Sequence, residues 1–162
     1  MNELPKTIAE ELARKASSVG ISIEEYLFDL LFRDLDPVAS AEKYIMGAQQ
    51  LLEQAEQELR AGDLRQASEK IWGACALSIK AHALAKKGLR LETHGDLWVY
   101  KNEVARKLGD WVRVAFMMAD SMRRNSYEDI ATGEDIESAL REVRNLVNKI
   151  SETLSLNRSR SS

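Results

Sequence analysis

Apolar residues recur at steps of three and four positions along most of the chain, the spacing that gathers side chains on one face of an α-helix. The clearest case lies near the C-terminus, where the steps alternate between four and three over residues 134–154. Such alternation is typical of a helix in an antiparallel bundle or a coiled coil. The positions of this seam are Ile136, Leu140, Val143, Val147, Ile150 and Leu154.

Two long helices are predicted over residues 37–60 and 64–87. Asp36 and Pro37 suit the cap and the first turn of the earlier helix. In the later helix apolar residues surround nearly the whole circumference, which indicates a central, buried helix. It is expected to end at Gly88, because glycine readily adopts the left-handed conformation that closes a helix.

Shorter helices are predicted over residues 97–108 and 111–124, with polar connections at 89–96 and 125–133. No stretch alternates between apolar and polar residues as a half-buried strand would. We therefore predict an all-α fold, in which residues 37–156 form a bundle of about five helices.

The sequence of residues 1–36 predicts two further short helices, which form a separate helix-turn-helix element. Capping boxes at Thr7–Glu10 and Ser22–Glu25 mark their starts. Two short helices cannot bury so apolar a face alone, so we expect this N-terminal pair to take part in dimerisation. Residues 157–162 are expected to form a flexible tail. The candidate interface residues are Tyr26, Leu27, Leu30, Leu31 and Trp72.

Composition is that of a folded protein that does not span a membrane. The 162 residues include 23 basic and 26 acidic side chains, for a net charge of −3, and no apolar run approaches about 20 residues. The single cysteine, Cys75, excludes an intramolecular disulfide and favours a reducing compartment. We therefore expect a cytoplasmic protein with no membrane partner.

One set of motifs resembles a known family. The run Ala67-Ser68-Glu69-Lys70-Ile71-Trp72-Gly73-Ala74-Cys75-Ala76 follows Ala61-Gly62-Asp63 and precedes Lys80-Ala81, His94 and Arg124-Asn125-Ser126-Tyr127-Glu128. Over residues 37–154 the chain is similar to the archaeal PaREP family, small proteins with a HEPN-like helical bundle. Ser126 departs from the family's usual asparagine-phenylalanine-tyrosine form. The resemblance implies a HEPN-like fold, self-association and a regulatory setting of the toxin–antitoxin or RNA-related kind.

The nuclease motif of HEPN relatives is absent. Relatives that cut RNA carry an arginine, four to six residues and then a histidine, and neither His82 nor His94 follows an arginine at that spacing. The resemblance therefore does not carry a catalytic activity to this chain, and we assign no catalytic residue.

The N-terminal pair has a resemblance of its own. Leu4-Pro5-Lys6, a helix and then Gly20 to Leu27 are similar to the two helices of ribbon–helix–helix regulators. Those proteins read DNA with a β-ribbon, and too few residues precede Pro5 to form one. Packing or dimerisation is the role this pattern favours.

Polar side chains suggest two candidate surfaces, each with a simpler interpretation as solvated residues. Glu69 and Lys80 are eleven positions apart and share a helix face, so with residues of the Arg124–Glu128 segment they could line a polar groove. A cluster of basic residues could contact the phosphates of a nucleic acid. The groove candidates are Glu69, Lys70, Lys80, His94, Arg124, Asn125, Tyr127 and Glu128. The nucleic-acid candidates are Lys86, Lys87, Arg90, Arg106, Lys107 and Arg123.

The sequence predicts neither a metal site nor a cofactor site, since it contains no zinc-ligand spacing and no phosphate-binding glycine loop. The leading hypothesis is a non-catalytic interaction module that forms a homodimer, with a protein or an RNA as further partner. The first alternative is a divergent ribonuclease that uses Arg124, Asn125 and Tyr127. The second is a nucleic-acid-binding regulator that uses the basic cluster.

Overall fold

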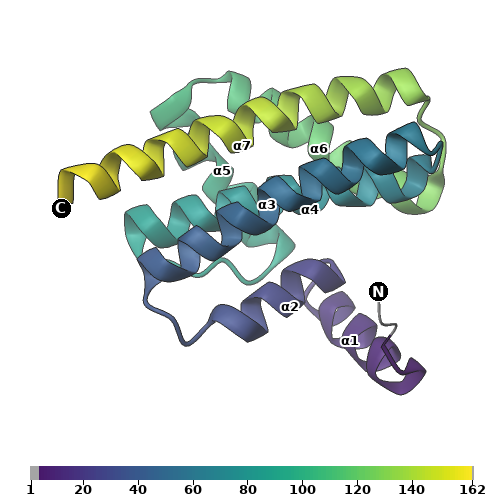
Figure 1. Cartoon of the computed structure of the whole chain (residues 1–162), viewed down its shortest axis with the longest axis horizontal. Helices are drawn as coiled ribbons and strands as arrows, with labels where there is room; N and C mark the ends of the chain where they lie inside the picture. The colour runs from purple at the N-terminus through teal and green to yellow at the C-terminus, as the bar shows by residue number, and fades with distance from the viewer. Residues whose placement is uncertain (1–3, 162) are drawn as a thin grey trace.

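The computed structural model describes residues 4–161, with side chains up to Ser155. Within this range the chain forms seven α-helices and no strand, which confirms the all-α prediction (Figure 1). The helices are α1 (Lys6–Ser18), α2 (Ile23–Phe32), α3 (Pro37–Arg60), α4 (Leu64–Lys87), α5 (His94–Leu108), α6 (Trp111–Glu128) and α7 (Gly133–Ser161).

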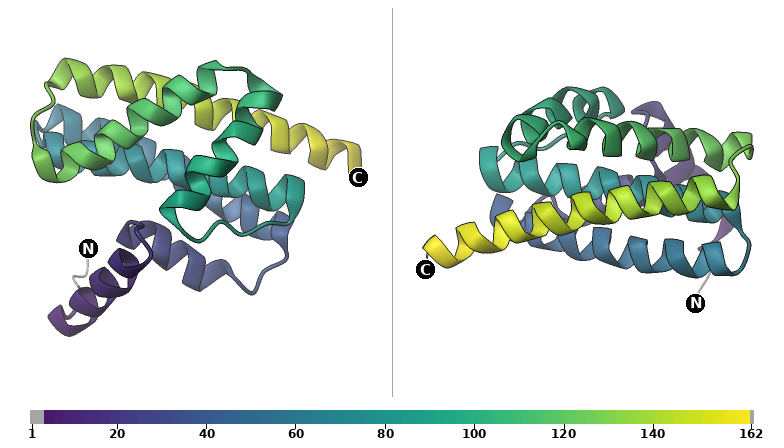
Figure 2. Two further views of the ribbon diagram at one scale, coloured as in Figure 1. Left: turned by 180° about the vertical axis from the view of Figure 1, so that it is seen from behind. Right: turned by 90° about the horizontal axis from the view of Figure 1, so that it is seen from above.

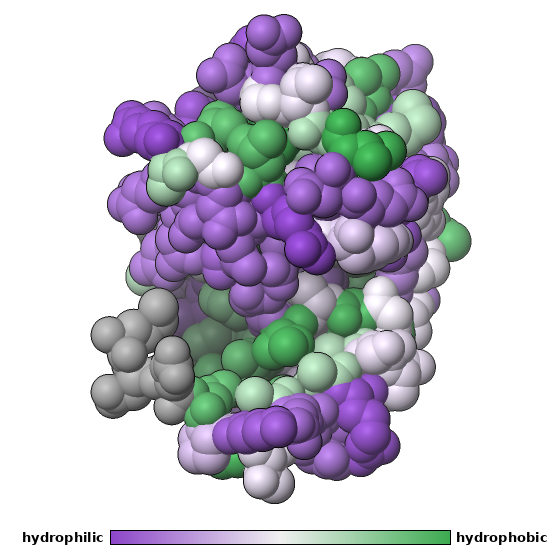
Figure 3. Space-filling model, turned by 90° about the vertical axis from the view of Figure 1, so that its right-hand side faces the viewer, coloured by the Kyte–Doolittle hydropathy of each residue, from purple (hydrophilic) through white to green (hydrophobic). Residues whose placement is uncertain are grey.

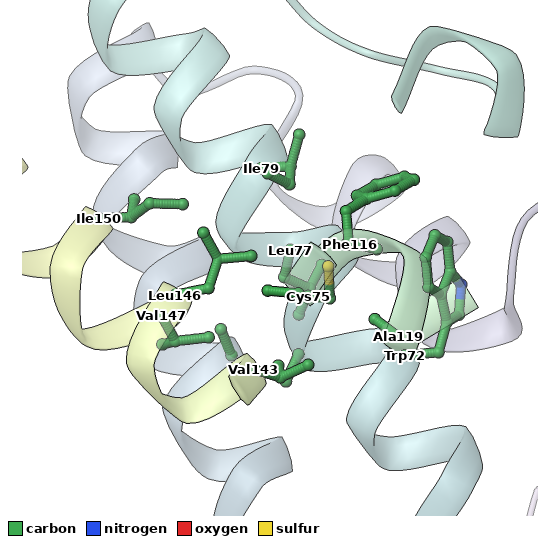
Figure 4. Packing of buried hydrophobic residues seen from close by; sticks show 14 of the residues in the cluster. Trp72, Cys75, Leu77, Ile79, Phe116, Ala119, Val143, Leu146, Val147 and Ile150 are labelled. Atoms are coloured by element: carbon green, nitrogen blue, oxygen red, sulfur yellow. The ribbon is translucent and has the colours of Figure 1, made fainter. Parts of the chain in front are cut away.

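Helix α4 is the centre of the fold, as its apolar circumference predicts. Every residue from Ile71 to Leu84 is buried, and α4 contacts α2, α3, α5, α6 and α7. Small residues permit this close packing: a Cβ atom on Gly73 would lie 2.9 Å from Leu51. Figure 4 shows side chains of α4 meeting Val143 and Val147 of α7 on one side.

Helices α3, α4, α6 and α7 run side by side, and α5 lies at an angle to them (Figure 2). The seam of α7 faces inward: it is buried from Ile136 to Ile150, while Leu154 is only half-buried. The C-terminal end of α7 extends past the other helices (Figure 1). The expected flexible tail at 157–162 lies outside the residues whose side chains the structure describes.

Most predicted helix ends are found where expected. Asp36 accepts a hydrogen bond from the Ala39 amide with Pro37 in the first turn, and Gly88 adopts the left-handed conformation after α4. The capping box at Ser22 and Glu25 is formed.

Three boundaries were predicted wrongly. Helix α5 begins at His94, because Thr93 and Asp96 form a capping box within the segment predicted to be a loop. Helix α6 continues to Glu128, where Asp129 ends it in the left-handed conformation. The Thr7–Glu10 capping box is not formed, since α1 already begins at Lys6.

The N-terminal pair packs against the bundle mainly through α2. Phe28 of α2 lies on the backbone of Gly47 in α3, where a Cβ atom would be only 2.3 Å from the Phe28 ring. Helix α1 packs chiefly against α2, and Ala16 is its only residue that is buried. The pair is thus attached to the bundle by α2.

We expect Gly47→Ala to displace Phe28 and loosen α2. Overpacking costs about 1–3 kcal/mol, and the better helix propensity of alanine returns up to about 1 kcal/mol, so the net loss of unfolding free energy is up to about 2 kcal/mol. Hydrogen exchange should show less protection in α2. Gly133→Ala is the matched control, since no atom lies within 4 Å of its new methyl group. Unchanged protection of α2 in Gly47→Ala would show that Phe28 does not anchor the pair.

Among the described residues no helix combines the length and the apolar character needed to cross a membrane.

Candidate functional site

A buried ionic cluster holds α2 on α4. Lys80 of α4 is only 2% exposed, and its Nζ atom lies 2.8 Å from Asp29 Oδ2 and 3.7 Å from Glu25 Oε1. The indole nitrogen of Trp72 donates a hydrogen bond to Glu25 Oε2 at 3.2 Å. Glu25 is fully buried, so Lys80 supplies the opposite charge that makes its burial tolerable.

Further polar contacts extend this cluster to α3 and to the turn after α2. The Tyr44 hydroxyl donates a hydrogen bond to Asp29, and burial together with that carboxylate raises the pKa of Tyr44. Arg90 donates to the carbonyl oxygens of Phe32 and Leu35, the latter at 3.0 Å. These side chains fix the position of α2.

The residues predicted to form a dimer interface differ in how much of their surface is exposed. Trp72 is 2% exposed and belongs to the protein's own core, where it packs against Phe116. Tyr26 and Leu27 are half-buried. Leu31, at 70% exposure, is the predicted interface residue that presents the most surface.

A cleft of about 350 Å³ separates α1 from the bundle. The surface is hollowed between the N-terminal helices, at the bottom of Figure 3, and the bundle above them. One wall consists of small residues of α1 together with the turn that leads to α2. The opposite wall comes from α4 and α6 and contains Glu69, Trp72, Arg123, Ser126 and Tyr127.

Glu69 is the carboxylate in this cleft. Burial raises its pKa above the ordinary value and repulsion from Glu24 adds to the rise, while Lys70 acts in the opposite direction. Lys70 itself lies 3.3 Å from Glu24 in an ion pair. Glu69 forms no hydrogen bond or ion pair with any residue that the structure describes.

A second polar cluster lies behind the cleft. Asp120 of α6 is buried, and its carboxylate lies 3.1 Å from His94 Nε2 and 3.0 Å from Arg123 Nε. Burial alone would raise the pKa of Asp120, but these hydrogen bonds outweigh it and lower the pKa to about 2. The Trp98 indole nitrogen lies 3.0 Å from the same His94 nitrogen, and His94 Nδ1 is buried without a partner among the described residues.

The other predicted groove residues lie on different sides of the molecule. Arg124, Asn125 and Glu128 line a groove of about 500 Å³ between α6 and α7. The buried Asn125 side chain accepts hydrogen bonds from the amides of Ile130 and Ala131, at 2.7 and 2.8 Å. Glu69 and Tyr127 therefore share the cleft, Lys80 belongs to the ionic cluster, and Arg124, Asn125 and Glu128 face α7.

The residues predicted to contact a nucleic acid also lie on separate parts of the molecule. Lys87 and Arg106 both approach Glu103, at 3.9 and 2.7 Å. The pKa of the buried His82 falls to about 4, mainly through burial and then through repulsion from Lys86, Lys107 and Lys87. Lys86, Lys87, Arg106 and Lys107 thus gather near the ends of α4 and α5. Arg90 instead binds the turn after α2, and Arg123 lines the cleft.

Four polar residues that organise these sites are not among the predicted site residues. The sequence pattern predicts Glu25 only as a capping residue, and no motif marks Asp29, four positions later on the same helix face. Asp120 interrupts the apolar stripe of α6, and an acid in such a stripe is a signal of a buried partner. Tyr44 lies on the apolar face of the helix predicted over residues 37–60, where spacing alone indicates a core residue. In the part of the chain that the structure describes, no group of three or more His, Cys, Asp or Glu side chains is placed to hold a metal ion.

An apolar groove of about 440 Å³ runs between α3, the end of α4 and the C-terminal part of α7. Val38 and Met46 on its rim are half exposed, and Leu154 contributes from α7. This α3–α7 groove lies where the seam of α7 emerges from the bundle.

Comparison with known proteins gives one match. The sequence matches the Archaeal PaREP1/PaREP8 family over residues 43–147, which is most of the helical bundle. No curated protein and no solved structure matches the chain. The match covers more than half of the sequence, and the chain belongs to the archaeal PaREP1/PaREP8 family.

Proposed function

We propose that the chain is a non-catalytic interaction or regulatory module that works as a homodimer, with two copies meeting along the α3–α7 groove. The observation that carries this proposal is the seam of α7, which continues beyond its partners within the chain. Ile150 is fully buried, whereas Leu154, the next seam position, is only half-buried beside an apolar groove. In a two-fold symmetric pair, each copy would offer the same groove and the same emerging seam.

The setting of His94 supports a role without catalysis. A general base must present a free nitrogen to its substrate. Here Nε2 faces Asp120 and Trp98, while Nδ1 is buried. The alternative ribonuclease would need Arg124, Asn125 and Tyr127 to act together, but Asn125 caps the turn after α6 and Tyr127 lines the opposite cleft.

The same proposal includes a HEPN-like bundle and a regulatory role of the toxin–antitoxin or RNA-related kind, which the family resemblance implies. It also includes a cytoplasmic location, which the single cysteine favours. Burial raises the pKa of the Cys75 thiol, which keeps it protonated and unreactive. The basic residues at the ends of α4 and α5 are the surface that a nucleic acid would contact in the alternative role as a regulator.

We expect the native chain to have twice the 18.3 kDa mass of one copy in solution, measured by size exclusion with light scattering. Met46→Glu should convert it to a monomer, because an unpaired charge in an apolar interface costs several kcal/mol, which weakens association at least about 100-fold. Val99→Glu on α5 is the control, since Val99 is 74% exposed and lies outside the groove.

A dimer that persists in Met46→Glu would place the interface elsewhere, with Leu31 of α2 as the next residue to change. A native chain that is monomeric at high concentration would contradict the homodimer. A species whose ratio of absorbance at 260 and 280 nm shows bound nucleic acid would favour the regulator.

A further inference from the structure

We propose that the cleft between α1 and the bundle binds a small organic cation. In this site the ammonium or guanidinium group of the ligand pairs with the Glu69 carboxylate, and its apolar stem lies against the exposed ring of Tyr127. The proposal does not rest on the dimer, because the cleft lies within one chain and away from the α3–α7 groove.

Among the residues that the structure describes, no cation forms an ion pair with Glu69. Lys70, its neighbour along α4, pairs with Glu24 at 3.3 Å, and Arg123 in the cleft wall binds Asp120 at 3.0 Å. Lys70 and Arg123 are thus engaged by other carboxylates, and Arg65, one turn before Glu69, donates to the Ser126 carbonyl oxygen at 3.2 Å. A half-buried carboxylate that has lost part of its hydration gains more from an added cation than a solvated one does.

The walls of the cleft suit an organic cation better than an inorganic ion or an anion. Among the described residues that line the cleft, Glu69 is the only one with a carboxylate. A divalent metal ion needs several oxygen ligands, so it fits this site poorly. An anion would have to displace Asp120 from Arg123. Aromatic rings attract a cation placed over their faces, and the exposed Tyr127 ring lies on the same wall as Glu69.

The opposite wall gives the ligand room. Ala13, Ala16 and Ser17 of α1 and Gly20 of the following turn are small and leave a volume of about 350 Å³. This volume lies at the lower end of the range for small-molecule sites. An alkyl ammonium ion with a short chain therefore complements the charge of the cleft and fits within its volume.

The test uses n-butylammonium and n-butylguanidinium chloride as probes, with n-butanol as a neutral analogue and sodium chloride at equal ionic strength. We expect saturable NMR shifts of the Tyr127 ring and the Glu69 carboxyl with at least one cation. Glu69→Gln should weaken binding at least tenfold. Glu137→Gln, a change at an exposed glutamate of α7, should leave it unchanged. The affinity should also fall as the pH drops through the raised pKa of Glu69, because the protonated carboxyl cannot pair with a cation.

Two results would overturn the proposal. One is that Glu69→Gln binds the cation as tightly as the native chain does. The same holds if the native chain binds n-butanol as tightly as it binds the cation. The other is the absence of any saturable shift at roughly 10 mM, well above a millimolar dissociation constant.

The stability of Glu69→Gln separates loss of binding from loss of fold. Because the folded pKa of Glu69 lies above its unfolded value, ionisation of Glu69 destabilises the folded chain at neutral pH, and this penalty disappears below the unfolded pKa. Glu69→Gln should therefore be as stable as the native chain or slightly more so at pH 7. If the chain proves to be a monomer rather than the proposed dimer, the binding results expected here stay the same.

Discussion

Lys80→Ala should lower the free energy of unfolding by about 3–5 kcal/mol, the usual cost of leaving a buried ionic partner without its counter-charge. The change removes the cation that lies 2.8 Å from Asp29 and 3.7 Å from Glu25. For a chain of this size the melting temperature should fall by roughly 6–20 °C. Thermal and denaturant unfolding followed by circular dichroism would measure the loss.

Hydrogen exchange would show where this loss acts. Protection should fall first in α2, because Glu25 and Asp29 both lie there, while α7 keeps its protection. Lys43→Ala is the matched control, since Lys43 is an exposed lysine of α3. Adding Glu25→Gln and Asp29→Asn to Lys80→Ala should recover part of the loss, because neutral amides are easier to bury than carboxylates. A loss below about 1 kcal/mol in Lys80→Ala would mean that water reaches the cluster and replaces the ammonium group.

Asn125→Ala should lower the free energy of unfolding by about 2–4 kcal/mol. The Asn125 carboxamide accepts hydrogen bonds from the Ile130 and Ala131 amides and donates one to Ser68 at 2.9 Å. Alanine removes these three hydrogen bonds, and each contributes about 0.5–1.5 kcal/mol to stability. Chemical denaturation would measure the change.

Two further variants test this assignment. Asn125→Asp keeps an acceptor for both amides but removes the donor to Ser68, so its loss should be about half as large. Asn148→Ala, at an exposed asparagine of α7, should change stability little. If Asn125→Ala were as stable as the native chain, the turn after α6 would not depend on this side chain, and a catalytic use of Asn125 would deserve a new test.

The helices were largely predictable because periodicity and capping are local properties of the sequence. The seam from Ile136 to Ile150 and the buried α4 follow directly from spacing. The errors at Thr93 and Asn125 arose where polar residues determine the structure. Threonine and aspartate form a cap in a segment predicted to be a loop, and the Asn125 side chain binds the turn that follows a helix longer than predicted.

The candidate site was only partly predictable. Glu69 and Tyr127 share a cleft, as the groove prediction requires, but Lys80 and Asn125 each serve a different structural cluster. Helix phase gives the side of α4 on which a residue lies, yet it does not say which other helix covers that side. Whether Lys80 meets solvent or two acids depends on where α2 packs, and that packing depends on the missing side chain of Gly47.

The weak attachment of α1 has a consequence for the motion of the molecule. Stability is not uniform across a fold, and elements with few buried contacts open at a small fraction of the global free energy. Helix α1 buries only Ala16 and packs chiefly against α2, whereas α2 is fixed by the Lys80 cluster. Local unfolding of α1 alone would therefore remove one wall of the cleft while the bundle stays intact.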